Sequence, residues 1–185
     1  MRPRPPPNYL AGYPPDLVAP VLRLIDQDQL GAVLLKKYPL AHEVRTDKAL
    51  YDYVQGLKGE FMRNVGQVSK VAFDSKLRVI RQALGTHTSI SRVQGTKLKS
   101  KREIHVATVF KEMPPEFLRM IVVHELAHLK EGAHDKAFYQ LCCHMEPDYH
   151  QLEFELRVYL SHLAAGGQVL WSATPGAGAF FDEVE

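Results

Sequence analysis

Three histidines and Glu125 lie close together between residues 124 and 134. His124 and His128 are four residues apart, so on an α-helix they lie on one face, one above the other. Two imidazoles in this arrangement can bind one Zn²⁺, and Glu125 lies next to the same site. His134 follows beyond Gly132, a glycine that can end the helix. Three nitrogens and one carboxylate are typical of a metal-dependent hydrolase.

The spacing also assigns a role to each of these side chains. A Zn²⁺ ion held by His124, His128 and His134 keeps a fourth position for water and lowers the pKa of that water to about 7. Glu125 leaves the helix about 100° from His124, so it is a poor fourth ligand but a suitable catalytic base. The sequence therefore predicts a zinc metallopeptidase that cleaves peptide or related amide bonds in a peptide or protein substrate.

The residues around the histidines favour a metal site over a chance match. A short pattern can arise by chance in a chain with 9 histidines. Residues 116–130, however, are apolar nearly all round and should be buried, and burying two imidazoles and a carboxylate costs free energy unless each finds a partner. His134 is favoured as the third ligand because the chain can turn back after Gly132. The alternatives for that third position are Glu131, Asp135 and His144.

Composition sets broader limits on the function. The chain has 185 residues, 45% of them hydrophobic, which fits one domain with a substantial core. The net charge of +2 singles out neither nucleic acid nor a membrane as partner. Cys142 and Cys143 are adjacent, an arrangement that rarely forms a disulfide. No signal peptide and no run of about 18 apolar residues is visible, so we expect a cytoplasmic protein without membrane contact.

The pattern of apolar residues, prolines and glycines divides the chain into four predicted segments. These are a Pro-rich arm (1–15), an N-terminal helical region (16–65), a metallopeptidase domain (66–165) and a flexible C-terminal tail (166–185). Helices are predicted from Asp16, from Thr46 to about 64, and at 74–84, 116–130, 135–145 and 151–163, and a short apolar stretch lies at 30–35. Strands are predicted at 68–73, 86–93 and 103–109, the last two joined as a hairpin through 94–102.

Several short segments resemble those of a known family. They are Pro115-Glu116, the run 122–129, Phe138 four residues after His134, and the run 145–149. Together they resemble the YgjP-like family of metal-dependent hydrolases, relatives of the zincin peptidases, and more distantly the SprT-like and WLM peptidases. The resemblance implies that His124, His128 and His134 bind zinc and that Glu125 is the catalytic base.

The resemblance also implies an α+β fold. We expect a zincin-like core in which a short antiparallel sheet packs on the helix that carries His124 and His128. One edge of this sheet could bind an extended substrate by strand addition. The helices of residues 16–65 would form an additional N-terminal layer.

Two other functions are compatible with the sequence. Lys97, Lys99, Lys101 and Arg102 could contact phosphates, as in a DNA-associated SprT-like protease, although such a run is more often a solvated turn. Alternatively, the zinc could be structural and hold together the helices of a non-catalytic partner-binding module. Tyr149 or His150 could reach the site as an electrophile, although aromatic packing is the commoner role. Composition and pattern leave the oligomeric state open.

Overall fold

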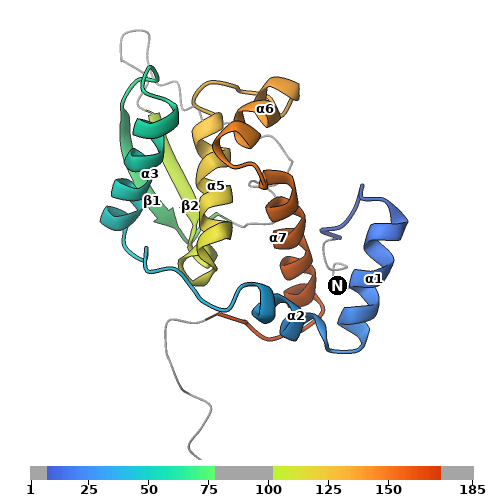
Figure 1. Ribbon diagram of the computed structural model, residues 1–185. Coiled ribbons are helices and arrows are strands. Elements are labelled where there is room, and N and C mark those ends of the chain that lie inside the picture. The colour runs from blue at the N-terminus through green and yellow to red at the C-terminus, as the bar shows by residue number, and fades with distance from the viewer. Residues whose placement is uncertain (1–7, 78–101, 172–185) are drawn as a thin grey trace, which may run out of the picture.

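The computed structural model describes residues 8–77 and 102–171, which form an α+β fold (Figure 1). The elements in chain order are α1 (Pro15–Asp26), α2 (Leu30–Lys37), α3 (Asp47–Phe61), β1 (Val68–Asp74), β2 (Arg102–Ala107), the 3-10 helix η1 (Thr108–Glu112), α5 (Pro115–Ala127), α6 (Lys136–Met145) and α7 (Tyr149–Ala164). Before β1 and after β2, the predicted helix boundaries lie within a few residues of those in the structure.

The sheet is parallel, so the prediction of an antiparallel sheet was wrong. Strand β1 pairs with β2 in parallel register, from Val68 opposite Arg102 to Asp74 opposite Ala107. The predicted strand 86–93 and most of the predicted hairpin lie outside the described residues. Parallel pairing requires a connection of about a dozen residues or more, and residues 75–101 are long enough to provide it. The predicted helix 74–84 does not begin at Asp74, which ends β1.

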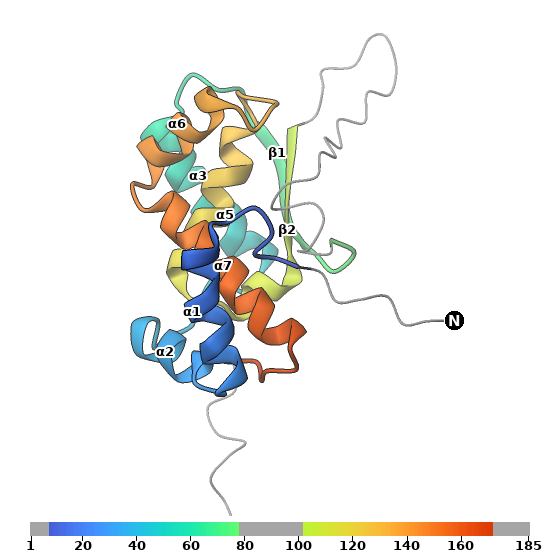
Figure 2. The ribbon, with the colours of Figure 1, turned by 90° about the vertical axis from the view of Figure 1, so that its right-hand side faces the viewer.

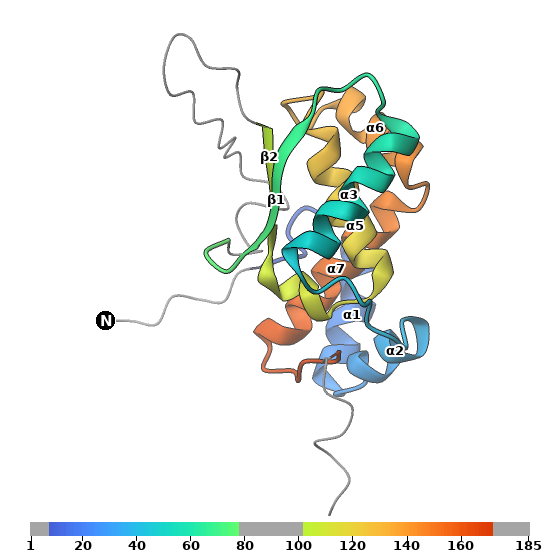
Figure 3. The same ribbon diagram turned by 90° about the vertical axis from the view of Figure 1, so that its left-hand side faces the viewer.

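Helix α5 lies at the centre of the fold. Its buried residues point in all directions, as the apolar sequence predicted. Figures 2 and 3 show the two strands on one side of α3 and α5. Figure 1 shows α6 and α7 on the other side of α5 from the strands. Helix α3 packs on β1 and α5, whereas α1 and α2 contact each other and α2 reaches α7. The predicted N-terminal helices are thus divided between the core and the periphery.

Local sequence signals explain where the site-bearing helices begin and end. The backbone N–H of Ala49 donates to the Thr46 side chain at the start of α3, which confirms the predicted cap. Pro115 occupies the first turn of α5, where its missing N–H costs nothing. The regular part of α5 ends at Ala127, earlier than predicted, because the N–H groups of Leu129 and Lys130 bond three residues back in a tightened turn.

The chain after α7 returns to the core. Residues 166–171 belong to the predicted C-terminal tail, yet Trp171 is only 4% exposed. Its indole N–H donates to the backbone oxygen of Tyr38 over 2.7 Å, and its ring contacts those of Phe117 and Tyr159. Trp171 thereby joins the ends of α2, α5 and α7. Among residues 8–77 and 102–171, none of the helices combines the length and the apolar character that crossing a bilayer requires.

Candidate metal centre

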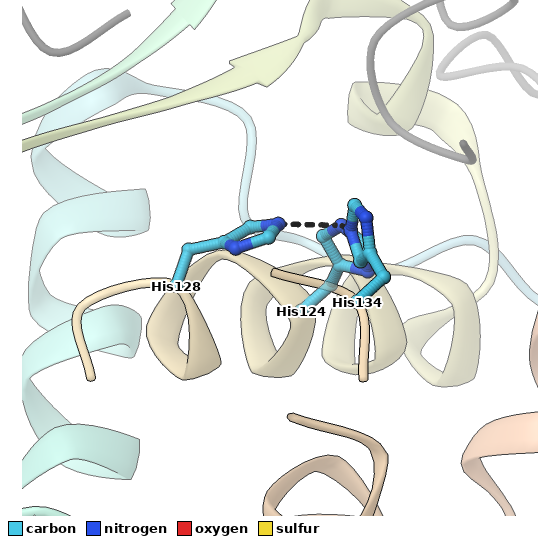
Figure 4. A group of neighbouring side chains, drawn as sticks. All are labelled: His124, His128 and His134. Carbon is cyan, nitrogen blue, oxygen red and sulfur yellow. Dashed lines mark hydrogen bonds between the residues drawn. The ribbon is translucent and has the colours of Figure 1, made fainter. Parts of the chain in front are cut away.

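The three predicted histidine ligands converge on one point (Figure 4). The Nε2 atom of His124 lies 3.2 Å from Nε2 of His128 and 3.1 Å from Nε2 of His134. Two nitrogens bound at about 2.0–2.1 Å to one tetrahedral Zn²⁺ are about 3.3 Å apart, so the observed spacing fits a shared ion. In the described part of the chain, this trio is the group of side chains arranged to hold a metal.

Each histidine comes from a different structural setting. His124 is buried in the last turn of α5, and His128 is the residue that caps the C-terminus of that helix. His134 lies in the connection to α6, immediately before Asp135, whose side chain caps α6. The helix ends before Gly132, and that glycine does not adopt a left-handed backbone conformation. The return of the chain to the site therefore does not depend on the conformational freedom of a glycine.

A single phenylalanine supports all three imidazoles. The ring of Phe138 lies 4.6–5.0 Å, centroid to centroid, from those of His124, His128 and His134. Phe138 is fully buried, and its backbone N–H donates to the Asp135 carboxylate at the start of α6. The cap therefore fixes the position of Phe138, and Phe138 holds the imidazoles in their facing arrangement.

The outward-facing nitrogens of two histidines have hydrogen-bond partners. Nδ1 of His128 lies 3.1 Å from the backbone oxygen of Glu131, and Nδ1 of His124 lies 2.7 Å from the Tyr149 hydroxyl. A carbonyl oxygen only accepts, so Nδ1 of His128 carries the proton and its Nε2 offers a lone pair. Such outer partners orient the ligands of metal sites.

The alternative third ligands have other positions or roles. Asp135 caps α6, and Glu131 contributes its backbone oxygen rather than its carboxylate to the contact with His128. The His144 ring packs edge-on against Phe61, on the exposed side of α6. None of the three belongs to the convergent group, whereas His134 does.

Burial governs the protonation of two predicted site residues on α5. It lowers the pKa of His124 well below 6.5, and the neighbouring His128 and His134 lower it further. His124 is therefore neutral at pH 7, the form that binds a metal. Glu125 keeps part of its surface exposed, but its carboxyl is surrounded by protein, which raises its pKa to about 7.

Sequence reasoning missed the place of Tyr149. Its hydroxyl lies on the Nδ1 side of His124, behind the imidazole, rather than at the point where the Nε2 atoms meet. Tyr149 opens α7 and is distant in sequence from α5, so no spacing rule connects it with His124. The predicted basic cluster lies outside the described residues except for Arg102, which is exposed at the start of β2.

Comparison with known proteins shows the family. Residues 66–159 match the family model described as YgjP-like, metallopeptidase domain. The chain is also 60% identical to a UTP pyrophosphatase of Escherichia coli (strain K12) over 159 residues, which cover 86% of this chain and 95% of the relative. No solved structure matches significantly. The matched segment contains all three convergent histidines, and the chain belongs to the YgjP-like family.

Proposed function

We propose that the chain is a metal-dependent hydrolase in which His124, His128 and His134 hold a Zn²⁺ ion. The observation that carries this proposal is that Nε2 of His128 and Nε2 of His134 lie 3.2 Å and 3.1 Å from Nε2 of His124. Imidazole also suits copper, iron and nickel, but three imidazoles beside a glutamate on a helix are the donor set of catalytic zinc. When bound, the ion would lower the pKa of a water molecule and polarise the bond to be cleaved.

The chain's own residues supply the rest of the reaction. Glu125 accepts the proton of the attacking water and returns it to the leaving group. His124 is held by Tyr149 and His128 by the Glu131 carbonyl, so both rings keep their orientation during turnover. The described residues bring together three histidines that could hold a metal ion, whereas a closed structural zinc site has four ligands, and this supports catalysis over a purely structural zinc.

The proposed substrate is a nucleoside triphosphate, with UTP the first choice. Water attacks the α-phosphorus, the bond to the α–β bridging oxygen breaks, and UMP and pyrophosphate are released. The support is the 60% identity to a UTP pyrophosphatase along 95% of that relative. The assay therefore compares all four common ribonucleoside triphosphates.

A peptide or protein substrate is the second candidate. It is supported by the description of the matched family model as a metallopeptidase domain and by the pairing of His124 and His128 with Glu125. The same water activation serves an amide carbonyl, with an amine as leaving group. The predicted cytoplasmic location is compatible with either substrate and stays a prediction.

One experiment separates the two substrates. Zinc-loaded protein is incubated with UTP, with the other three triphosphates and, in parallel, with a mixture of unstructured peptides. We expect UMP and pyrophosphate in equal amounts, no orthophosphate as first product, and loss of the reaction when zinc is chelated. Peptide cleavage without triphosphate hydrolysis would replace the first candidate with the second. A zinc-free protein that hydrolyses UTP at the same rate would overturn the metal mechanism.

A further inference from the structure

A buried tyrosine stands directly behind the innermost histidine of the site. The Tyr149 hydroxyl lies 2.7 Å from Nδ1 of His124. Tyr149 is fully buried and His124 is 3% exposed, so neither group can exchange this contact for water. The two rings are nearly parallel, with an interplanar angle of 16° and centroids 6.3 Å apart. A phenylalanine at this position would keep the shape of the ring and would lose only the hydroxyl that contacts His124.

We propose that Tyr149 is a positioning residue that selects the metal-binding tautomer of His124. A neutral imidazole carries one proton, and a proton on Nε2 would block the atom that faces His128 and His134. By accepting a hydrogen bond from Nδ1–H, the hydroxyl keeps the proton on the far side and leaves the Nε2 lone pair free. This inference rests on the proposed metal centre and is independent of which substrate is hydrolysed.

The surroundings of Tyr149 also offer an acceptor for the proton of its hydroxyl. If the oxygen accepts from His124, its own proton needs an acceptor, because a buried unpaired hydroxyl costs free energy. The side chain of Cys142, a fully buried residue of α6, lies close enough to act on the Tyr149 hydroxyl. Donation from Tyr149 to the sulfur completes a chain from His124 through Tyr149 to Cys142. That chain links α5, α7 and α6.

The test compares two buried tyrosines of the same helix. Tyr149→Phe removes the hydroxyl that contacts His124, whereas Tyr159→Phe removes one that hydrogen-bonds the backbone of Leu170. Tyr159 is 2% exposed and packs against Trp171 and His162 rather than against the three histidines of the site. Zinc dissociation constants are measured by competition with a chromogenic chelator. We expect about 10–100-fold weaker zinc binding for Tyr149→Phe and near wild-type binding for Tyr159→Phe.

A second measurement uses the wild-type protein and so does not depend on the folding of any variant. Imidazole ¹⁵N NMR of the zinc-free wild-type protein reports which nitrogen of His124 carries the proton, and we expect Nδ1. A proton on Nε2 of His124 would overturn the inference, as would equal zinc affinity of the Tyr149→Phe and wild-type proteins. If the wild-type protein binds no zinc, the metal centre itself is wrong and the inference fails with it. The two failures are therefore distinguishable.

Discussion

The backbone oxygen of Glu131 lies 3.1 Å from Nδ1 of His128 and fixes the proton of that imidazole. A backbone group provides the contact, so the side chain of Glu131 is dispensable for it. Glu131 was also an alternative third ligand in the sequence. Removal of its side chain therefore tests whether its carboxylate binds the metal.

We predict that Glu131→Ala binds zinc as tightly as the wild-type protein, whereas His134→Ala loses most of its zinc. The alanine at position 131 keeps the carbonyl oxygen, but the alanine at position 134 removes one of three convergent nitrogens. Metal analysis of dialysed protein checks both variants. His144→Ala is the matched histidine control, because His144 packs against Phe61 outside the site. Zinc retained by His134→Ala at one ion per chain would contradict the proposed ligand set.

We predict that Glu125→Gln keeps its zinc and loses about 10²–10⁴-fold in the rate of hydrolysis. Glutamine has nearly the same shape as glutamate but cannot accept the proton of the attacking water. The rate is measured with whichever substrate the product analysis selects, at saturating zinc. Activity within a few-fold of wild type would exclude Glu125 as the base.

His42 should make the stability of the protein sensitive to acid. Its Nε2 lies 2.6 Å from the backbone oxygen of Phe110, and its Nδ1 accepts from the N–H of Val44, so the native contacts require the neutral ring. Burial lowers its pKa below 6.5. Below pH 6.5 the unfolded chain therefore binds a proton at His42 more readily than the folded chain. The contribution of His42 to the free energy of unfolding consequently falls as the pH falls.

Urea unfolding of zinc-free protein at pH 7.5 and at pH 5 measures this effect. We expect His42→Asn to cost the most free energy of unfolding at pH 7.5 and less at pH 5, because only the wild-type chain loses the His42 contribution on acidification. The comparison of the two proteins cancels the contribution of His124, which titrates in both. A difference that stays constant between the two pH values would count against this assignment.

Trp171 should contribute strongly to stability although it follows the last helix. We predict that Trp171→Ala lowers the free energy of unfolding by about 3–5 kcal/mol, because a large buried side chain and its hydrogen bond to Tyr38 are lost together. Val169→Ala, two residues away and 64% exposed in the native protein, is the control and should change little. Circular dichroism is the appropriate probe, since the chain has a single tryptophan. Equal stability of the two variants would show that the packing around Trp171 is dispensable.

Local patterns were sufficient for the features that depend on near neighbours. The four-residue spacing of His124 and His128 determines that they share a helix face, and Thr46 marks the start of α3 through its own side-chain contact. Both features involve residues within one helical turn. They follow from backbone geometry whatever the rest of the chain does.

Contacts between distant segments were decided only by the tertiary structure. The parallel pairing of β1 with β2 joins two segments that are distant in sequence, and the residue pattern of a strand does not show in which direction it pairs. The place of Tyr149 behind His124 depends on how α7 packs against α5. The amino-acid sequence by itself thus determined which side chains could bind a metal. The packing of the helices decided which imidazole nitrogens face one another and which groups hydrogen-bond the imidazoles. The sequence could not predict these contacts, because they join residues that are far apart in the chain.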